Sequence, residues 1–273
     1  MSSDRRVGTR RLELSYVRKM SPDGWYQEKD RRWVPTIPNS FGLPSGTTCP
    51  GMTKFCDGCY AAEAENSKSV RAKLERNLAL IEEVATVAAM VELLDAMMHR
   101  YWRTVTRRGV RRHDRIFRIH WAGDFHSVNY AKAWAIVIRC HPQIKFWVYT
   151  RSFTPAVNVV PYLVGIPNLA LYLSVDQYNL ERATPILEAD QRIKAARCGE
   201  DVYTTRELLP DRPASVCPEN LDHKLLVVDG RGACLNCRIC PQGSQDVIFV
   251  TMGHKATTPQ LTFPLDDLKV RRT

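Results

Sequence analysis

Short apolar segments typical of β-strands alternate along this chain with longer segments that have the periodicity of helices. The strand-like segments are 115–123, 145–150, 169–175, 224–230 and 246–252, and the helix-like ones are about 67–102, 127–140, 155–164 and 179–197. This alternation predicts βαβ units around a parallel sheet. The strands are mostly continuous apolar runs, which indicates burial on both faces. We therefore expect an α/β fold, best described as a full or partial (β/α) barrel, with a doubly wound open sheet as the alternative.

Polar residues follow three consecutive strands of the predicted sheet. In β/α barrels the chemistry gathers at the carboxyl ends of the strands, so these positions are the first candidates for a functional site. Asp124 could instead cap the helix that begins near Ser127, and Arg151 could simply pair with a carboxylate. The candidates are His120, Gly123, Asp124, His126, Arg151 and Asp176.

Three cysteines lie close together early in the chain. Cys49, Cys56 and Cys59 have the spacing C-x6-C-x2-C. Three thiolates with a vacant fourth corner suit a [4Fe–4S] cluster that keeps one iron open for a substrate or cofactor. Zinc is the alternative, because a structural zinc site takes four ligands and a histidine could complete it across the fold. The histidines considered for that position are His113, His120 and His126.

A second group of cysteines lies near the C-terminus. Cys234, Cys237 and Cys240 follow a C-x2-C-x2-C spacing with Pro241 directly after, which favours iron–sulfur ligation over zinc. Cys217 is the natural fourth ligand and would complete the site. Of the two remaining cysteines, Cys140 is expected to be a buried small hydrophobe and Cys198 has no spacing partner.

Charge and hydropathy restrict the location and the partners. The chain of 273 residues carries a formal net charge of +10, and its arginines concentrate between Arg103 and Arg118. Guanidinium groups suit phosphates, so the stretch is compatible with nucleic acid or a nucleotide as a partner, although a solvated helix end and turn is the favoured interpretation of such a charge run. No apolar run reaches the roughly 20 residues that cross a membrane, and the start lacks a secretory signal. We expect a cytoplasmic protein. The arginines are Arg103, Arg107, Arg108, Arg111, Arg112, Arg115 and Arg118.

Three stretches carry a resemblance to a known superfamily. "LPSGTTCPGMTKFCDGCYA" (43–61), "HWAGDF" (120–125) and "FWVYTRS" (146–152) resemble radical S-adenosylmethionine (SAM) proteins, and within them a phage-encoded, radical-SAM-like group. The resemblance spans about residues 40–242. The superfamily usually has C-x3-C-x2-C and Gly-Gly-Glu where this chain has C-x6-C-x2-C and Ala-Gly-Asp.

The resemblance implies cofactors and roles. Cys49, Cys56 and Cys59 would hold a [4Fe–4S] cluster whose open iron binds SAM, and reduction would cleave SAM to a 5′-deoxyadenosyl radical. Gly123 and Asp124 would receive the SAM amino group, and Arg151 or Asp176 its carboxylate or ribose. The second cysteine group, Cys217, Cys234, Cys237 and Cys240, would hold an auxiliary cluster. The electron donor would be a flavodoxin or ferredoxin, and the location the host cytoplasm.

The same resemblance gives a domain organisation. Residues 1–40 would form an irregular N-terminal segment, 41–210 a radical-SAM-like β/α core, and 211–273 a C-terminal segment with the auxiliary cluster. The alternative function is a non-catalytic iron–sulfur or zinc protein that binds nucleic acid or a host protein through the arginine-rich stretch.

Overall fold

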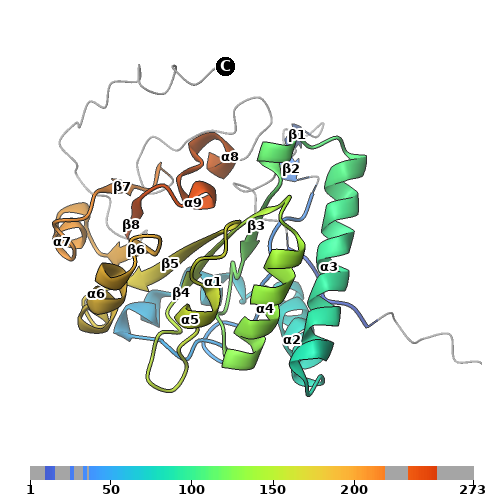
Figure 1. Ribbon diagram of the computed structural model, residues 1–273, viewed down its shortest axis with the longest axis horizontal. Coiled ribbons are helices and arrows are strands. Elements are labelled where there is room, and N and C mark those ends of the chain that lie inside the picture. Colours follow the sequence, from blue (N-terminus) through green and yellow to red (C-terminus); the bar gives the residue numbers. More distant parts are fainter. Residues whose placement is uncertain (1–9, 16–24, 28–32, 36, 219–232, 251–273) are drawn as a thin grey trace, which may run out of the picture.

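A six-stranded parallel sheet forms the centre of the computed structural model, which describes residues 10–15, 25–27, 33–35, 37–218 and 233–250 (Figure 1). Its strand order is β3-β4-β5-β6-β8-β7. The α/β class and the parallel sheet are confirmed. The strands are β3 Ile116–Ile119, β4 Lys145–Thr150, β5 Leu169–Val175, β6 Lys194–Gly199, β7 Ala214–Val216 and β8 Asp246–Val250. A separate antiparallel pair joins β1 (Trp25–Gln27) to β2 (Trp33–Pro35).

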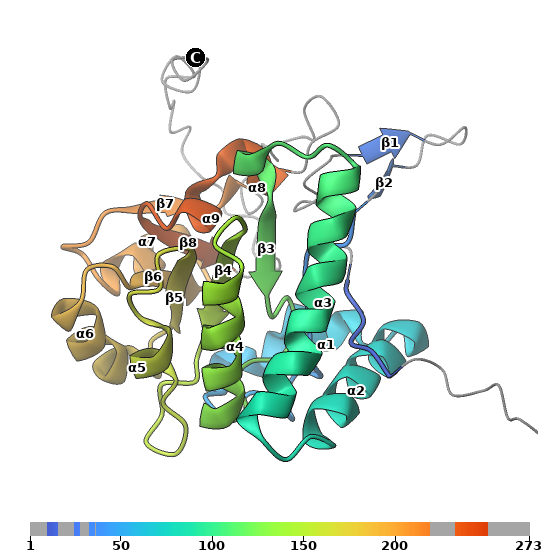
Figure 2. The same ribbon diagram turned by 45° about the vertical axis from the view of Figure 1, so that its right-hand side comes forward.

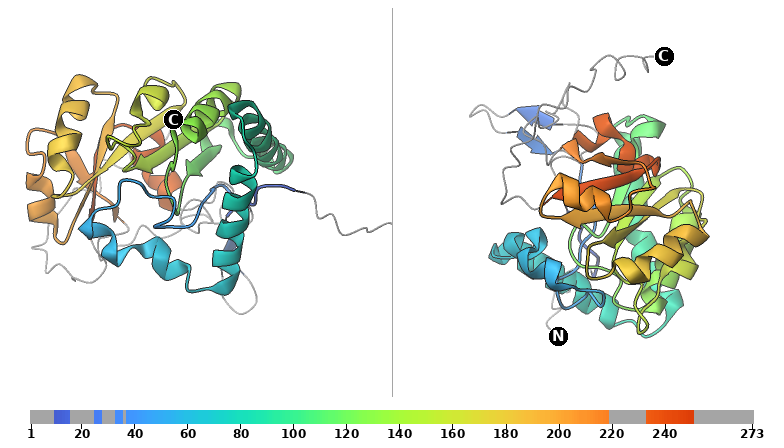
Figure 3. Two further views of the ribbon diagram at one scale, coloured as in Figure 1. Left: turned by 90° about the horizontal axis from the view of Figure 1, so that it is seen from below. Right: turned by 90° about the vertical axis from the view of Figure 1, so that its left-hand side faces the viewer.

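Side chains alternate between the two faces of the sheet, as the pleat requires. Phe117, Phe146 and Leu171 pack on one face, which we call the helix-covered face. It is covered by α3 (Val87–Arg107), α4 (Val128–Cys140), α5 (Val160–Leu163) and α6 (Leu180–Ala189), which Figure 3 shows on one side of the strands. The short helix α7 (Val202–Glu207) packs on β8.

The opposite face carries the second cysteine group, and we call it the cysteine-bearing face. Trp147 and Tyr172 pack there with Val247 and with Leu235 of α8 (Ala233–Cys237). The next helix is α9 (Ile239–Gln242). The remaining helices precede the sheet in sequence: η2 (Lys54–Gly58), α1 (Tyr60–Ala64) and α2 (Lys68–Glu82), with the short η3 (Arg112–Asp114) before β3. Figure 2 shows α1 and α2 at the end of the molecule toward which β3 points.

The expected barrel is wrong, because the sheet is open. Strand β8 inserts between β6 and β7, so the spatial order departs from the sequence order that a barrel needs. At the other edge, β3 is bordered by the segment around Phe41, whose N–H donates to the Arg118 carbonyl at 3.1 Å and whose carbonyl accepts from Trp121 N at 2.9 Å. That pairing occupies the edge at which a closing strand would bind. The doubly wound alternative is not matched either, since α3 to α6 share one face.

Two helix predictions also need correction. The helical segment expected over 67–102 is two helices, because the chain breaks after Glu82 and Thr86 starts α3 by accepting from Ala89 N at 3.2 Å. The segment 179–197 is helical only to Ala189, and its end is strand β6. The predicted cap at Ser127 is confirmed: its Oγ accepts from Tyr130 N at 3.3 Å. The predicted strand 224–230 lies outside the described residues.

A buried ion cluster stabilises the junction of β6 and β8. Asp246 accepts from Arg197 Nη2 at 3.0 Å and from Arg212 Nε at 2.9 Å, and its Oδ1 also accepts from Ala195 N at 2.8 Å. Burial by itself would raise the pKa of Asp246, but the Arg212 guanidinium, the Ala195 amide and Arg197 outweigh it and hold the pKa below its ordinary value. The inserted strand is therefore joined to its neighbour by charge as well as by backbone hydrogen bonds.

Asp246→Asn should lower the free energy of unfolding by about 3–5 kcal/mol at neutral pH, because it leaves the buried Arg197 uncompensated. The folded-state pKa lies below the unfolded one, so this stabilisation is complete above the unfolded pKa of about 3.9 and is lost as the pH falls through the folded pKa. The difference between wild type and variant in urea denaturation should accordingly shrink in acid. The exposed Asp211→Asn is the control and should change stability by less than about 0.5 kcal/mol. Equal effects of the two substitutions would contradict the prediction.

Candidate metal centres

The loop that carries the first three cysteines packs directly on the carboxyl edge of the sheet. A Cβ built on Gly51 would lie 1.9 Å from the Arg151 carbonyl oxygen, so the two backbones are in contact. Gly123 has φ +73°, and a Cβ there would lie 2.5 Å from Thr48 Oγ1 and 2.7 Å from the Leu43 carbonyl. Glycine is therefore required at both contact points. These contacts place the loop over the turns that follow β3 and β4.

Cys49, Cys56 and Cys59 act on one another electrostatically and are free thiols. Burial raises the pKa of Cys49 to about 12, and Asp124 and then the two other cysteines contribute in the same direction. The turns of the loop are closed by backbone bonds from Cys56 N to Thr53 O at 2.9 Å and from Cys59 N to Cys56 O at 3.1 Å. The three thiols therefore belong to one loop, but among the described residues neither cysteine group brings three sulfur atoms within 4.8 Å of one another.

Asp124 is buried at the edge of the sheet and its carboxylate has three donors. Oδ1 accepts from Phe125 N and from Thr150 Oγ1, both at 2.7 Å, and Oδ2 accepts from Arg151 N at 2.6 Å. Burial raises the pKa of this carboxyl although these hydrogen bonds oppose the shift. The side chain therefore ties the ends of β3 and β4 together, and Ser127 caps α4 in its place.

Arg151 and Asp176 form an ion pair below the cysteine loop. The Asp176 carboxylate also accepts from Thr53 Oγ1 at 2.7 Å, and the Arg151 guanidinium lies 5.7 Å from the Phe55 ring centroid. Both Thr53 and Phe55 belong to the loop, so the pair holds the loop to the ends of β4 and β5. Contact of Gly123, Asp124, Arg151 and Asp176 with SAM stays a prediction.

Cys198 is a residue of this site that the sequence analysis missed. It lies in β6, and burial raises its pKa to about 11, with Arg151 opposing and Asp176 and Cys56 contributing. Its thiol lies 3.5 Å from the Ala196 carbonyl, and because it interacts electrostatically with Arg151 and Cys56 it is a candidate fourth thiol for the first group. The signal was present in the sequence, since Cys198 is the last residue but one of a strand and Asp176 directly follows one. The strand itself was taken for a helix.

The three histidines considered as a fourth ligand contact other side chains, but within the described structure Nδ1 of His120 and Nδ1 of His126 are buried without a hydrogen-bond partner. His120 is buried in an aromatic cluster, where its Nε2 lies 2.9 Å from the Tyr130 hydroxyl, and burial lowers its pKa well below the ordinary value. His126 stacks on the ring of Tyr130 at a centroid distance of 4.9 Å. His113 lies 3.4 Å from Asp114 on η3.

The second group gathers on the cysteine-bearing face. Cys217 follows β7 and donates its N–H to Ile248 O at 2.9 Å, while Cys234 and Cys237 lie in α8 and Cys240 in α9. Arg238 joins the two helices in a left-handed conformation, with φ 60°. Burial raises the pKa of Cys240 to about 12, with the Tyr149 hydroxyl opposing and Cys217 and Cys237 contributing. The chain therefore brings Cys217 to the other three across an intervening segment.

Arg118 lies between the two cysteine groups. Its Nη2 donates to the Tyr60 hydroxyl at 2.7 Å, and Tyr60 directly follows Cys59. On the other side its guanidinium lies 5.0 Å from the Tyr149 ring centroid and acts on Cys234 and Cys240. Its Nε is buried without a hydrogen-bond partner, and among the described residues no carboxylate pairs with it.

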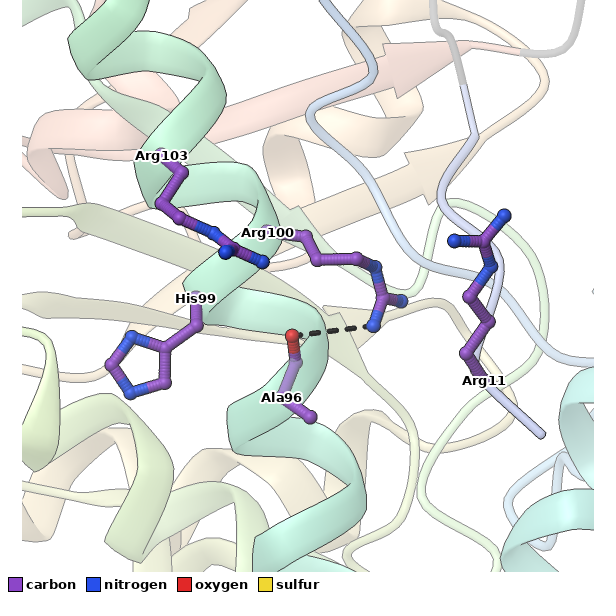
Figure 4. A pocket seen from close by; sticks show the side chains of 5 residues that line it. All are labelled: Arg11, Ala96, His99, Arg100 and Arg103. Carbon is purple, nitrogen blue, oxygen red and sulfur yellow. Dashed lines mark hydrogen bonds between the residues drawn. The ribbon is translucent and has the colours of Figure 1, made fainter. Parts of the chain in front are cut away.

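The arginine-rich stretch covers the end of α3 and the turn after it. Arg103, Arg107, Arg108, Arg111 and Arg112 are exposed. Arg103 also lines a surface pocket of about 510 Å³ with Arg11, Ala96, His99 and Arg100 (Figure 4). These positive groups favour a polyanion, and binding of nucleic acid there stays a prediction. Within the described part of the chain, no helix is both long and apolar enough to span a membrane.

Fold and site together define a cysteine-rich α/β protein with two candidate metal centres. Residues 11–243 match the family described as Gene product 88, and the chain belongs to that family. It is 38% identical over 219 residues to the Gene 88 protein of Mycobacterium phage L5, which covers 79% of this chain and 87% of the relative. It is 36% identical over 221 residues to the Gene 88 protein of Mycobacterium phage D29, covering 79% and 88% respectively. No solved structure matches the chain.

This family assignment corrects the resemblance to radical SAM proteins. The matching family is Gene product 88, over almost the whole β/α region, and the comparisons give no radical SAM family. The open sheet agrees with the correction. The phage origin of the relatives was expected and is confirmed.

The close contact of the cysteine loop gives a direct test. Gly51→Ala should lower the free energy of unfolding by about 1–3 kcal/mol, because its Cβ overlaps the Arg151 carbonyl. It should also speed the reaction of the half-buried Cys49 with a thiol reagent. Gly58→Ala is the matched control in the same loop, since its Cβ would meet nothing within 4 Å. Similar unfolding curves for the two variants would contradict the close contact.

Proposed function

We propose that this protein is an iron–sulfur protein with two cluster sites. Cys217, Cys234, Cys237 and Cys240 would hold a complete [4Fe–4S] cluster, and Cys49, Cys56 and Cys59 would hold a second one with one iron open. Such clusters supply one-electron transfer, and an open iron adds a position where an exogenous molecule binds. We propose SAM as that molecule, with an enzymatic role at this position, in the reducing host cytoplasm.

The observation that carries the proposal is the charge around Arg118. Arg118 is partly buried, and its Nε is fully buried without a hydrogen-bond partner. Removing a guanidinium from water is costly unless an anion compensates it, and among the described residues its partners are the neutral hydroxyl of Tyr60 and the ring of Tyr149. The neighbouring Cys240 has its pKa raised to about 12, so as a free thiol it is uncharged at neutral pH. Metal ligation requires thiolates, which would place negative charge beside Arg118. The donor set therefore fits a bound anionic cluster.

The choice of iron over zinc rests on the donor sets. The second group offers four sulfurs at a spacing that favours iron–sulfur ligation. The first group offers three thiols, while His120 and His113 have polar partners and His126 stacks on the ring of Tyr130. A closed zinc site would need a fourth donor from this chain, and Cys198, which interacts electrostatically with Cys56, is the candidate for it. Zinc remains the second candidate for that reason.

The arrangement of the groups assigns roles to the residues between them. Tyr60, Arg118 and Tyr149 connect the first cysteine group to the second through a hydrogen bond and a cation–π contact. We propose that Arg118 compensates the charge of the second cluster. Asp176 and Arg151 would hold the loop so that the open position faces the carboxyl edge of the sheet.

Anaerobic protein reconstituted with iron and sulfide should be brown and hold about eight irons per chain. Cys234→Ser and Cys217→Ser should each remove about half of the iron, because each removes a ligand of the same cluster, and should lower the thermal stability. Cys140→Ser is the control, because that cysteine is exposed and lies outside both groups. Stoichiometric zinc with negligible iron and sulfide would contradict the proposal.

Electron paramagnetic resonance of the reduced protein tests whether SAM binds the open iron of the first cluster. Addition of SAM should change the signal of the cluster held by Cys49, Cys56 and Cys59 and leave the other signal unchanged. Cys198→Ser should keep its full iron content. If Cys198 closes the site instead, SAM will have no effect on the wild type, and Cys198→Ser will lose the first cluster or respond to SAM. Either result leaves the second cluster as an internal standard.

A further inference from the structure

A third group of potential metal ligands lies on the helix-covered face, away from the cysteines. Asp95 and His99 occupy adjacent turns of α3, four residues apart, so their side chains share one side of the helix. His141 follows α4 as its C-terminal cap residue. Because α3 and α4 pack against each other, the three side chains meet in one place.

The donor atoms already face a common centre. Asp95 Oδ1 lies 2.8 Å from His141 Nε2, and Asp95 Oδ2 lies 3.1 Å from His99 Nε2. All three ligand atoms lie within 4.8 Å of one another. Zinc bonds of about 2.0–2.2 Å place neighbouring ligand atoms about 3.4 Å apart in a tetrahedral site. An ion could therefore be accommodated by small side-chain movements.

Neighbouring groups fix His141. Its backbone carbonyl accepts from Asn168 Nδ2 at 3.0 Å, and the same amide donates to Ile138 O at 2.9 Å and Ile144 O at 3.2 Å. The other ring nitrogen, Nδ1, lies 3.5 Å from the Gln143 side-chain amide. A histidine that binds metal through one nitrogen usually carries a proton on the other and donates it to such a partner. The Gln143 amide, turned to present its oxygen, would accept that proton.

The site is open on one side. The His141 side chain is 3% exposed, whereas that of His99 is 60% exposed and that of Asp95 is 32% exposed. An ion held by all three would keep a coordination position toward solvent. The nearby Arg100 is directed away, because it donates to the carbonyls of Ala96 and Leu12 at 3.2 and 2.6 Å. Figure 4 shows the His99 ring turned away from Arg11.

We propose that Asp95, His99 and His141 bind one divalent transition-metal ion, with zinc as the best fit. Two imidazoles and one carboxylate are a nitrogen-rich set that suits zinc or a similar ion and disfavours calcium and magnesium. Three protein ligands with an open fourth position are the arrangement of catalytic zinc sites. The site is independent of the iron–sulfur proposal, since it shares no residue with either cysteine group.

The test is a Co²⁺ titration of the full-length, cluster-reconstituted protein. Cobalt bound by nitrogen and oxygen gives visible ligand-field bands without the thiolate charge-transfer bands of a cysteine site, so the two kinds of site are distinguished. The wild type should bind one equivalent of Co²⁺ that shows the ligand-field bands of nitrogen and oxygen ligation, and Zn²⁺ should displace this cobalt. His99→Ala should abolish that equivalent or weaken it at least about tenfold, since it removes one of three protein ligands.

His113→Ala is the matched control. His113 is likewise exposed and likewise adjacent to an aspartate, with its Nε2 3.4 Å from Asp114 Oδ1. Its removal should leave unchanged the one equivalent of cobalt that is bound by nitrogen and oxygen ligands. The proposal is overturned if the wild type shows no such equivalent, if His99→Ala binds cobalt as the wild type does, or if His113→Ala loses it equally. Loss of iron in cysteine variants would not affect this readout.

Discussion

The candidate site depends on the contact between the cysteine loop and the carboxyl edge of the sheet. Two glycines permit it, because side chains at Gly51 and Gly123 would overlap the opposing backbone. Asp124 then joins the ends of β3 and β4, and the pair of Arg151 with Asp176 binds the loop through Thr53. The polar residues at the strand ends thus position the loop. Their hydrogen-bonding capacity is largely used within the protein, so an exogenous ligand would find the thiols more accessible than the carboxylates.

Much of the fold was predictable because strands that are buried on both faces are apolar throughout. The segments of β3, β4, β5 and β8 were recognised on that basis. Strand β6 was not, because "KAARCG" has small and charged residues, and its Arg197 is buried only by virtue of the distant Asp246. The insertion of β8 beside β6 was equally unpredictable, since strand order depends on long-range pairing. Sequence periodicity identifies elements, and tertiary partners determine their order.

The candidate site was predictable to a different extent for each group. Spacing alone singled out Cys49, Cys56 and Cys59 in one loop and Cys234, Cys237 and Cys240 in another, and Cys217 was added as a fourth ligand. That either group binds a metal stays a prediction. Cys198 and the histidine–aspartate group were missed, since their members come from separate elements that only the fold unites. Cys140 was misjudged as buried and is exposed, because it occupies the last turn of α4 on the solvent side. The superfamily resemblance rested on short motifs, whereas the family match extends over residues 11–243.

Charge links the two cysteine groups into one system. Because side chains alternate along β3, Arg118 lies on the cysteine-bearing face of the sheet. It lies beside Trp147 and Tyr149 of the neighbouring strand, at a position where an apolar residue would be expected. A guanidinium whose described partners are neutral is unfavourable, and this penalty falls if a metal ionises the neighbouring thiols, whose ionisation is otherwise opposed by burial. Ionisation of these thiols by a metal would also strengthen the contact of Arg118 with Tyr60, which directly follows Cys59 of the first group. Metal binding at the second group is therefore expected to stabilise the fold around the first, because a ligated anion beside Arg118 orders the residue that contacts Tyr60.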